Sequence, residues 1–298
     1  MRKSLINSLL SYKDDPKFCV LTGDLGFNAL EPLRNALGER FINAGIAEQN
    51  MISLAAGLAK MGLRPFVYSI SPFIYARASE QIRNDICFHD LPVCLIGSGA
   101  GYGYGNQGPT HHALEDYGTL STLQNMKIFV PSFASDMAEL VNNIINFNHP
   151  VYIRLGRDES FTGDNYNREN FAPYRKLKSG FSPSAGVILV IGNMAGSVLH
   201  FCRDKNFSVW SCGVLPLEIN SIPAGLFDDI KNSDTLFIIE DHVKTGGLGE
   251  QFGAVMLESG IIPEKFKILY AHGYANKLYG SQDYYRANNG LNLKELIK

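Results

Sequence analysis

Cysteine is sparse in this chain, and long apolar runs are absent from it. The five cysteines are odd in number and form no C-x-x-C pair or cluster with histidine, which argues against a disulfide framework or a zinc site. Buried thiols in a reducing compartment are the better prediction. No apolar run reaches the roughly 18 residues that a membrane-spanning helix needs, and the opening residues MRKSLINSLLSYKDD hold too short an apolar run for a signal peptide. We therefore expect a cytoplasmic protein with no membrane span.

A strong excess of either charge is also absent. The formal net charge is -2 at pH 7, so no bulk field attracts nucleic acid or a membrane surface, and neither is an expected partner. Any anionic ligand must then be held by local groups. The 298 residues are 45% hydrophobic and 19% charged, an ordinary composition for a folded protein, and this length allows one large domain or two smaller ones.

Strand-like and helix-like segments alternate along the chain. In the first half, the expected strands are 18–22, 65–70, 91–97, 127–130 and 151–155, and the expected helices are 46–61, 72–89 and 135–147. In the second half, the expected strands are 186–191, 207–212 and 235–240, and the expected helices are 195–205 and 249–259. Such alternation predicts parallel sheets covered by helices.

A polar stretch without clear periodicity interrupts this alternation between residues 156 and 183. We interpret it as a connection between two domains. The predicted division is a first domain over 1–160, a linker over 161–182 and a second domain over 183–298. The predicted fold class is α/β, with each domain a mostly parallel sheet flanked by helices.

A glycine-rich segment follows the expected strand 91–97. Residues 97–112 read GSGAGYGYGNQGPTHH, and six glycines in so short a span cannot form the interior of a stable helix or strand. Its place after a strand puts it at the carboxyl edge of a parallel sheet, where ligands bind in such folds. The spacing is not a phosphate-binding fingerprint. A flexible surface loop is the alternative, but the adjacent His111 and His112 favour a functional loop.

Glu48 begins a helix that is apolar nearly all round and should be buried, within the stretch NAGIAEQNMISLAAGLA. A buried carboxylate is costly unless it is paired or protonated. Two ordinary interpretations remain open: a carboxylate that favours the positive end of the helix dipole, and an exposed helix residue.

Two further groups of charged residues follow expected strands. Arg154 and Arg157, in RLGR, are either solvated charges or ligands for an anion at the edge of the sheet. The run Glu240, Asp241 and His242 suggests acid–base chemistry, or else it caps the helix that follows.

The order and spacing of several motifs resemble one known family. GIAEQNM, PFIYARASEQ, LPVCLIG, GPTHHALED, VPSFASDMAEL and VYIRLGR together are similar to the pyrimidine-binding domain of transketolases and their relatives. IIEDHVKTGGLGE resembles the carboxyl-terminal domain of that family. The resemblance covers most of the chain from about Leu21 onward, and it is specific as a set.

The resemblance implies thiamine diphosphate as cofactor, bound between a pyrophosphate-binding and a pyrimidine-binding domain. The family's Gly-Asp-Gly motif with a downstream Asn, which holds Mg²⁺, is missing here, and Gly23-Asp24-Leu25 does not replace it. The resemblance therefore implies the carboxyl-terminal subunit of a split enzyme. A separate amino-terminal subunit would supply the diphosphate and Mg²⁺ site in an α2β2 heterotetramer, and this chain would hold no metal.

The resemblance also implies roles for single residues at the cofactor. Glu48 matches the glutamate that hydrogen-bonds a ring nitrogen of the aminopyrimidine, a role that requires its protonated form and that burial would favour. Phe73 would stack on the pyrimidine ring, with Tyr75 nearby. Asp24 matches an aspartate close to the cofactor.

The remaining matches concern the substrate. His111 would transfer a proton or stabilise an oxyanion at the reacting group, and Arg154 and Arg157 match positions that hold a substrate phosphate. Gln107 stands where sugar-specific relatives carry an aspartate, and Gly99 or a neighbour stands in place of a histidine.

The implied activity is transfer of a two-carbon ketol unit between sugar or sugar-phosphate substrates, and the departures at the glycine-rich loop favour a specialised ketol or acyl transfer on a modified or nucleotide-linked sugar. Two alternatives stay open. One is the β subunit of a 2-oxo acid dehydrogenase, with lipoamide as acceptor. The other is a non-catalytic assembly partner, against which the joint presence of Glu48, His111 and the arginines argues.

Overall fold

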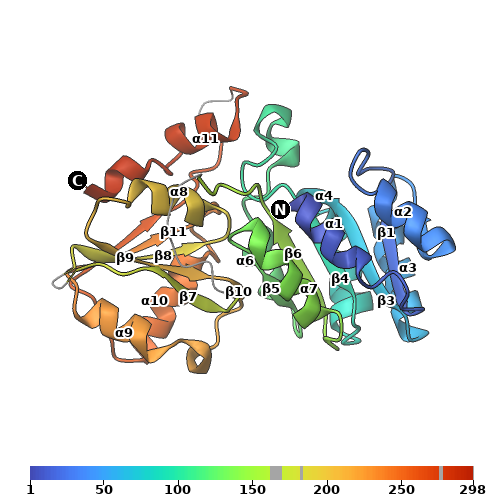
Figure 1. Ribbon diagram of the computed structural model, residues 1–298, viewed down its shortest axis with the longest axis horizontal. Helices are drawn as coiled ribbons and strands as arrows, with labels where there is room; N and C mark the ends of the chain where they lie inside the picture. Colours follow the sequence, from blue (N-terminus) through green and yellow to red (C-terminus); the bar gives the residue numbers. More distant parts are fainter. Residues whose placement is uncertain (162–169, 182–183, 275–277, 298) are drawn as a thin grey trace.

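The computed structural model describes residues 1–161, 170–181, 184–274 and 278–297. Two sheets lie side by side, the first drawn on the right of Figure 1 and the second on the left. The first has seven strands in the order β10-β5-β6-β4-β3-β1-β2, and the second has five in the order β12-β11-β8-β9-β7. Nearly all neighbouring strands are parallel, which confirms the predicted α/β class with two mostly parallel sheets flanked by helices.

The first sheet draws on both halves of the chain. Its strands are β1 (Phe18–Thr22), β2 (Phe41–Asn43), β3 (Arg64–Ile70), β4 (Cys94–Ser98), β5 (Lys127–Phe129), β6 (Val151–Leu155) and β10 (Val214–Leu215). Strand β10 comes from the second half and pairs antiparallel with β5, so it ties the two halves together. The other strands of this sheet run parallel, and their carboxyl ends therefore meet at one edge.

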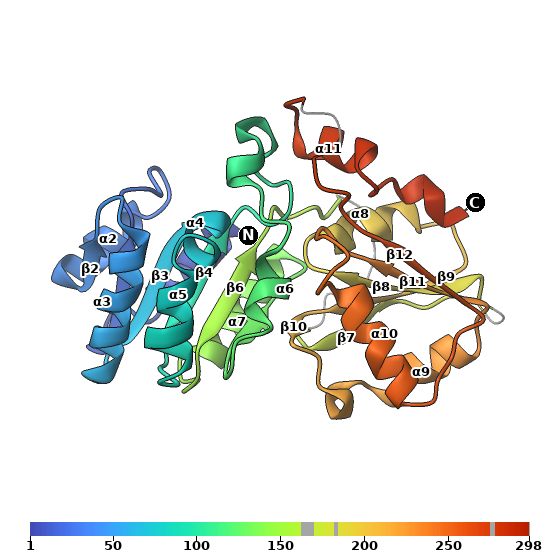
Figure 2. The same cartoon turned by 180° about the vertical axis from the view of Figure 1, so that it is seen from behind.

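Helices cover both faces of the first sheet. They are α1 (Arg2–Leu10), α2 (Glu31–Leu37), α3 (Glu48–Lys60), α4 (Ser71–Tyr75), α5 (Ser79–Gln81), α6 (Asp116–Leu120) and α7 (Met137–Ile144). Alternate side chains of β1 point to opposite faces of the sheet. Phe18 and Val20 pack in the core under α1, α2 and α7, whereas Cys19 and Leu21 pack under α3. Figure 1 shows α1 and α7 in front of the sheet, and Figure 2, from behind, shows α3 and α5 on the opposite face.

The predicted single helix over 72–89 is divided. After α4 the chain turns at residues 76–78, continues in α5 and then adopts π-helical geometry over Ile82–Cys87. This break matters for the site, because it places Arg77 in a turn where its side chain reaches Glu48.

The second sheet carries its own helices. Its elements are β7 (Tyr174–Lys178), β8 (Gly186–Ile191), α8 (Met194–Phe201), β9 (Phe207–Cys212), α9 (Ala224–Lys231), β11 (Thr235–Ile239), α10 (Leu248–Glu258), β12 (Lys265–Leu269) and α11 (Gln282–Asn288). Edge strand β7 lies inside the predicted linker 161–182 and pairs antiparallel with β9. In its sequence YRKLK, Tyr174 and Leu177 are buried and the two lysines are partly exposed. The strand therefore contains no apolar run from which it could be predicted. Of that predicted linker, residues 162–169 and 182 lie outside the described part.

All five cysteines are buried free thiols, as predicted. Burial raises the pKa of the Cys19 and Cys202 thiols to about 11, so they stay protonated and unreactive near neutral pH. Within the described residues, none of the helices combines the length and the apolar character that crossing a membrane requires.

Candidate functional site

The carboxyl edge of the first sheet gathers most of the predicted site residues. Gly23 and Asp24 follow β1, α4 with Phe73 follows β3, the glycine-rich loop follows β4, and Arg157 follows β6. Helix α3 begins at this edge, after β2. Parallel pairing thus brings together segments that are far apart in the sequence.

Glu48 is the first residue of α3, and only 2% of it is exposed. Its Oε2 accepts a hydrogen bond from Nη1 of Arg77 at 2.7 Å, which supplies the partner that a buried carboxylate requires. Its Oε1 lies 3.8 Å from the point where a Cβ on Gly23 would sit. The same Cβ would lie 3.1 Å from the Gly45 carbonyl oxygen, so glycine at position 23 suits the close packing of the backbone here.

Arg77 connects Glu48 to two other predicted site residues. Its guanidinium carbon lies 4.5 Å from the centroid of the Phe73 ring. The Phe73 centroid lies 5.1 Å from that of His111, with the rings at 64°, and His111 Nδ1 shares a 2.9 Å hydrogen bond with the Thr110 hydroxyl. The structure thus brings Glu48, Phe73 and His111 into one group. The motifs do not single out Arg77, although its four-residue spacing from Phe73 indicates neighbours on a helical turn.

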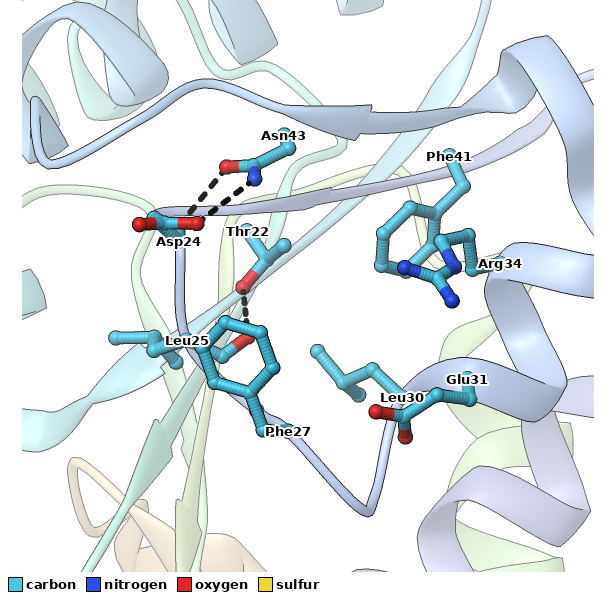
Figure 3. Close-up of a pocket in the computed structure, with 10 residues that line it drawn as sticks. Thr22, Asp24, Leu25, Phe27, Leu30, Glu31, Arg34, Phe41 and Asn43 are labelled. Atoms are coloured by element: carbon cyan, nitrogen blue, oxygen red, sulfur yellow. Dashed lines mark hydrogen bonds between the residues drawn. The ribbon is translucent and has the colours of Figure 1, made fainter.

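Tyr75 and Asp24 lie outside this contact group. Tyr75 is buried, and its hydroxyl donates to Oε2 of Glu115 at 2.9 Å; burial raises the pKa of this phenol, which stays neutral. Asp24 is exposed and has a positive φ of 53°. Figure 3 shows Asp24 facing Asn43: the Asp24 N–H donates to the amide oxygen at 2.9 Å, and the amide NH₂ donates to the carboxylate at 3.2 Å. Both residues line a surface pocket of about 200 Å³ that also includes Phe27.

The glycine-rich loop is packed against the end of the chain. Figures 1 and 2 both show this loop (turquoise-green) beside the red segment that contains α11. The Tyr102 ring stacks on Tyr285 with centroids 5.0 Å apart. A Cβ on Gly108, whose φ is +77°, would lie 2.1 Å from the ring of Tyr279. The exposed Gln107 precedes this glycine, so the carboxyl-terminal segment holds the part of the loop that carries Gln107 and His111.

Arg157 is exposed and lines a second pocket, of about 260 Å³, together with Arg2, Ser98 and Tyr104. The hydroxyls of Tyr104 and Ser98 are 3.0 Å apart. The Tyr104 ring also lies 6.2 Å from the His111 ring, centroid to centroid. Tyr104 therefore stands between His111 and the pocket that Arg157 borders.

Arg154 is placed differently from the sequence-based prediction. Its side chain is fully buried, and Nε binds the carboxylate of Asp116 at 2.9 Å. Nη2 donates to the carbonyls of Ala113 and Asp241, at 2.8 and 2.7 Å. The structure corrects the prediction of a substrate anion at Arg154, because strand β6 directs this side chain into the interior, where it joins the two halves of the chain.

The run Glu240, Asp241 and His242 is also buried at this junction. The Glu240 carboxylate accepts hydrogen bonds from the Tyr117 hydroxyl and from the backbone N–H groups of Leu248 and Gly249, at 2.5, 2.6 and 3.0 Å. The last two are the first residues of α10, so Glu240 caps that helix. This finding favours the capping interpretation over acid–base chemistry.

His242 is held as a neutral imidazole. The Gly118 N–H donates to Nε2 at 3.1 Å, so Nδ1 carries the proton and donates to the Val243 carbonyl at 2.7 Å. The imidazole stacks on Tyr117, with ring centroids 3.9 Å apart. Burial lowers the pKa of His242 to about 4 and raises that of Glu240 to about 7.

These two shifts act in opposite directions on stability. As pH rises from 4.5 to 7, the unfolded chain releases a proton that folded Glu240 retains, so this term lowers the free energy of unfolding. As pH rises from 4 to 6.5, the unfolded chain loses a proton that folded His242 has already released, so this term raises the free energy of unfolding. Each term amounts to about 3 kcal/mol.

We therefore predict that His242→Gln makes stability fall as pH rises between about 5 and 6.5, because only the Glu240 term remains. Glu240→Gln should make it rise over the same range, and the wild type should vary much less than either variant. Urea unfolding at several pH values checks this expectation. If the free energy of unfolding depends on pH in the same way in all three proteins, Glu240 and His242 do not make these two contributions.

The fold is α/β, and the candidate site lies at the carboxyl edge of a parallel sheet, where such folds bind their ligands. Residues 8–161 match the family described as "Transketolase, pyrimidine binding domain", which is more than half of the 298 residues. The chain belongs to the transketolase family.

Individual relatives agree with this assignment. The chain is 29% identical to a subunit of the apulose-4-phosphate transketolase of Actinobacillus succinogenes, over 90% of this chain and 86% of that one. It is 31% identical to 1-deoxy-D-xylulose-5-phosphate synthase of Alkaliphilus oremlandii, over 81% of this chain but only 39% of that enzyme. A solved "Split gene transketolase, inactive beta4 tetramer" has 28% identity and a TM-score of 0.79, covering 99% of this chain and 95% of its own.

Proposed function

We propose that this chain is the carboxyl-terminal subunit of a thiamine-diphosphate-dependent transferase that moves a two-carbon ketol unit between sugar-type substrates. A separate subunit holds the diphosphate and Mg²⁺. The observation that carries the proposal is the contact group of Glu48, Arg77, Phe73 and His111 at the carboxyl edge of the sheet. It combines a buried carboxyl group, an aromatic face and an imidazole within reach of one ligand.

The residues of this group fit an aminopyrimidine. The flat guanidinium of Arg77 hydrogen-bonds the carboxyl group of Glu48 while it lies over the Phe73 ring, so one flat group can meet both side chains at once. Glu48 would hold a ring nitrogen of the pyrimidine, and Phe73 would stack on its face. When bound, thiamine diphosphate supplies the carbon nucleophile and the electron sink for ketol transfer.

The substrate side of the site uses other groups of the chain. If Nδ1 of His111 accepts from the Thr110 hydroxyl, Nε2 carries the proton and can donate it to a substrate oxygen. Gln107, exposed on the same loop, can bind a sugar hydroxyl as donor or acceptor. Arg157 borders a pocket next to this loop and can bind a phosphate end.

Exposed apolar side chains on α3 and just before it support the proposed partner. The sequence predicts a helix buried nearly all round, but Leu54 is 38% exposed and Ile46, two residues before Glu48, is 78% exposed. Exposed apolar residues beside a buried carboxyl group are expected where a second chain covers the surface. The similarity to one subunit of an apulose-4-phosphate transketolase and to a "split gene" transketolase supports the same arrangement, for which we propose α2β2 stoichiometry.

Reconstitution tests the reaction class. The chain is mixed with a partner that carries the Gly-Asp-Gly motif and downstream Asn, and the complex is offered ketose and aldose phosphates, including apulose 4-phosphate, or a 2-oxo acid with a lipoyl domain. We expect ketol transfer to the aldose phosphates and no acylation of the lipoyl domain. Acyl transfer to the lipoyl group would instead identify a 2-oxo acid dehydrogenase subunit, and no turnover in either assay would favour a non-catalytic partner.

A further inference from the structure

Arg77 makes the two contacts that the proposed site would give to a pyrimidine ring. It donates an N–H to Glu48 Oε2 at 2.7 Å, and its flat guanidinium lies over Phe73, with the central carbon 4.5 Å from the ring centroid. An aminopyrimidine bound by the same residues would also be a flat group, hydrogen-bonded to the carboxyl group and stacked on the aromatic ring. The guanidinium therefore stands where that ring would lie.

The two arrangements exclude each other for a chemical reason as well as a steric one. A guanidinium can only donate hydrogen bonds, so Oε2 of Glu48, the oxygen that Arg77 contacts, acts as an acceptor and cannot donate while this pair is formed. The proposed role of Glu48 requires that the carboxyl group donate a proton to a ring nitrogen. Stacking of a pyrimidine on the same face of Phe73 further requires that the guanidinium leave it.

The side chain of Arg77 can leave this position and move into solvent. Its side chain is 46% exposed, whereas that of Glu48 is 2% exposed. Arg77 sits in the turn between α4 and α5, and its partly exposed side chain can rotate into solvent. Glu48, fixed at the start of α3, cannot make the same movement.

We propose that Arg77 occupies the pyrimidine position while the cofactor is absent and that the ring displaces it on binding. This inference rests on the proposed function. In the absence of cofactor, Arg77 satisfies a buried carboxylate that would otherwise be unpaired. It thereby lowers the apparent affinity for the cofactor, since only molecules with Arg77 displaced can bind it.

The test is calorimetric titration of thiamine diphosphate with Mg²⁺ into the reconstituted complex. Arg77→Met keeps an unbranched side chain but removes its donors and charge, and we expect the dissociation constant to fall about threefold to fivefold, the range for a partly exposed ion pair. Arg83→Met, an exposed arginine in the following helical stretch, is the matched control and should leave it unchanged. Unchanged or weaker binding by Arg77→Met would overturn the inference, because Arg77 would then not compete with the ring.

A second measurement checks that the contact forms in the chain alone. Arg77→Met should lower the urea midpoint of the chain, whereas the same substitution in a Glu48→Gln background should lower it much less, because the charge that needs a partner is gone. Equal losses in both backgrounds would overturn the inference. If the wild-type complex binds no thiamine diphosphate, the proposed function fails together with it. If the complex binds thiamine diphosphate and Arg77→Met does not change the affinity, only the role of Arg77 is refuted and the proposed function stands.

Discussion

Glu48→Gln should reduce the activity of the reconstituted complex by about 10²-fold to 10⁴-fold, the range for loss of a general acid–base group. Glutamine has nearly the same shape, and its amide oxygen can still accept the hydrogen bond from Arg77. It cannot, however, exchange a proton with a ring nitrogen. The loss should therefore lie in turnover, measured as kcat with saturating cofactor. The free energy of unfolding of the chain, measured in urea, should change by less than about 1 kcal/mol.

Glu250→Gln provides the matched control for this substitution. Glu250 is also a first-turn glutamate, on α10, where its carboxylate accepts from the Gly246 N–H at 2.9 Å. It lies in the second half of the chain, and its replacement should leave kcat unchanged. Full activity of Glu48→Gln, or an equal loss in both variants, would refute the role assigned to Glu48.

The second large effect concerns stability. Asp116→Asn should lower the free energy of unfolding by about 3–5 kcal/mol, because it leaves the fully buried guanidinium of Arg154 without its counter-charge. Asp116 also accepts a hydrogen bond from the Tyr152 hydroxyl at 2.9 Å, so both partners are held in place. Since Arg154 donates to the Asp241 carbonyl as well, we expect the loss to affect the junction of the two sheets.

The partly exposed pair of Lys176 and Asp229, with a 2.8 Å contact, offers a comparison for this prediction. Lys176→Met should cost no more than about 1 kcal/mol, because solvent screens that pair. The double variant Arg154→Met/Asp116→Leu should recover part of the loss caused by Asp116→Asn, because it buries no charge but leaves two backbone carbonyls and the Tyr152 hydroxyl without these partners. Urea unfolding gives the free energy of unfolding of all three variants. A loss below about 1 kcal/mol for Asp116→Asn would show that the interior tolerates an unpaired Arg154.

Buried apolar strands could be predicted closely from the sequence. Strands β1, β6, β8 and β9 have the bounds that their apolar runs indicate, because both faces of a parallel sheet are covered and nearly every position is apolar. Strand β7 escaped prediction because an antiparallel edge strand keeps polar side chains toward solvent. The break in the helix after Tyr75 escaped as well, since Pro72 fits the first turn of a helix and nothing later in the run requires a break.

The site could be predicted in part. The motifs single out Glu48, Phe73 and His111, and the structure places them together. Arg77 was missed because its contact with Glu48 spans 29 residues and depends on a turn that no local pattern announces. Arg154 and Arg157, three residues apart, differ because the first lies within buried strand β6 and the second lies beyond its end. Motif spacing alone does not distinguish these environments.

Calorimetric titration of thiamine diphosphate with Mg²⁺ tests most directly whether this chain supplies half of a shared cofactor site. The ligand is titrated into this chain, into the partner chain and into their mixture. We predict tight binding only in the mixture, weakened when the mixture contains Glu48→Gln. Equally tight binding by the partner chain alone, or no binding by the mixture, would contradict the proposed site.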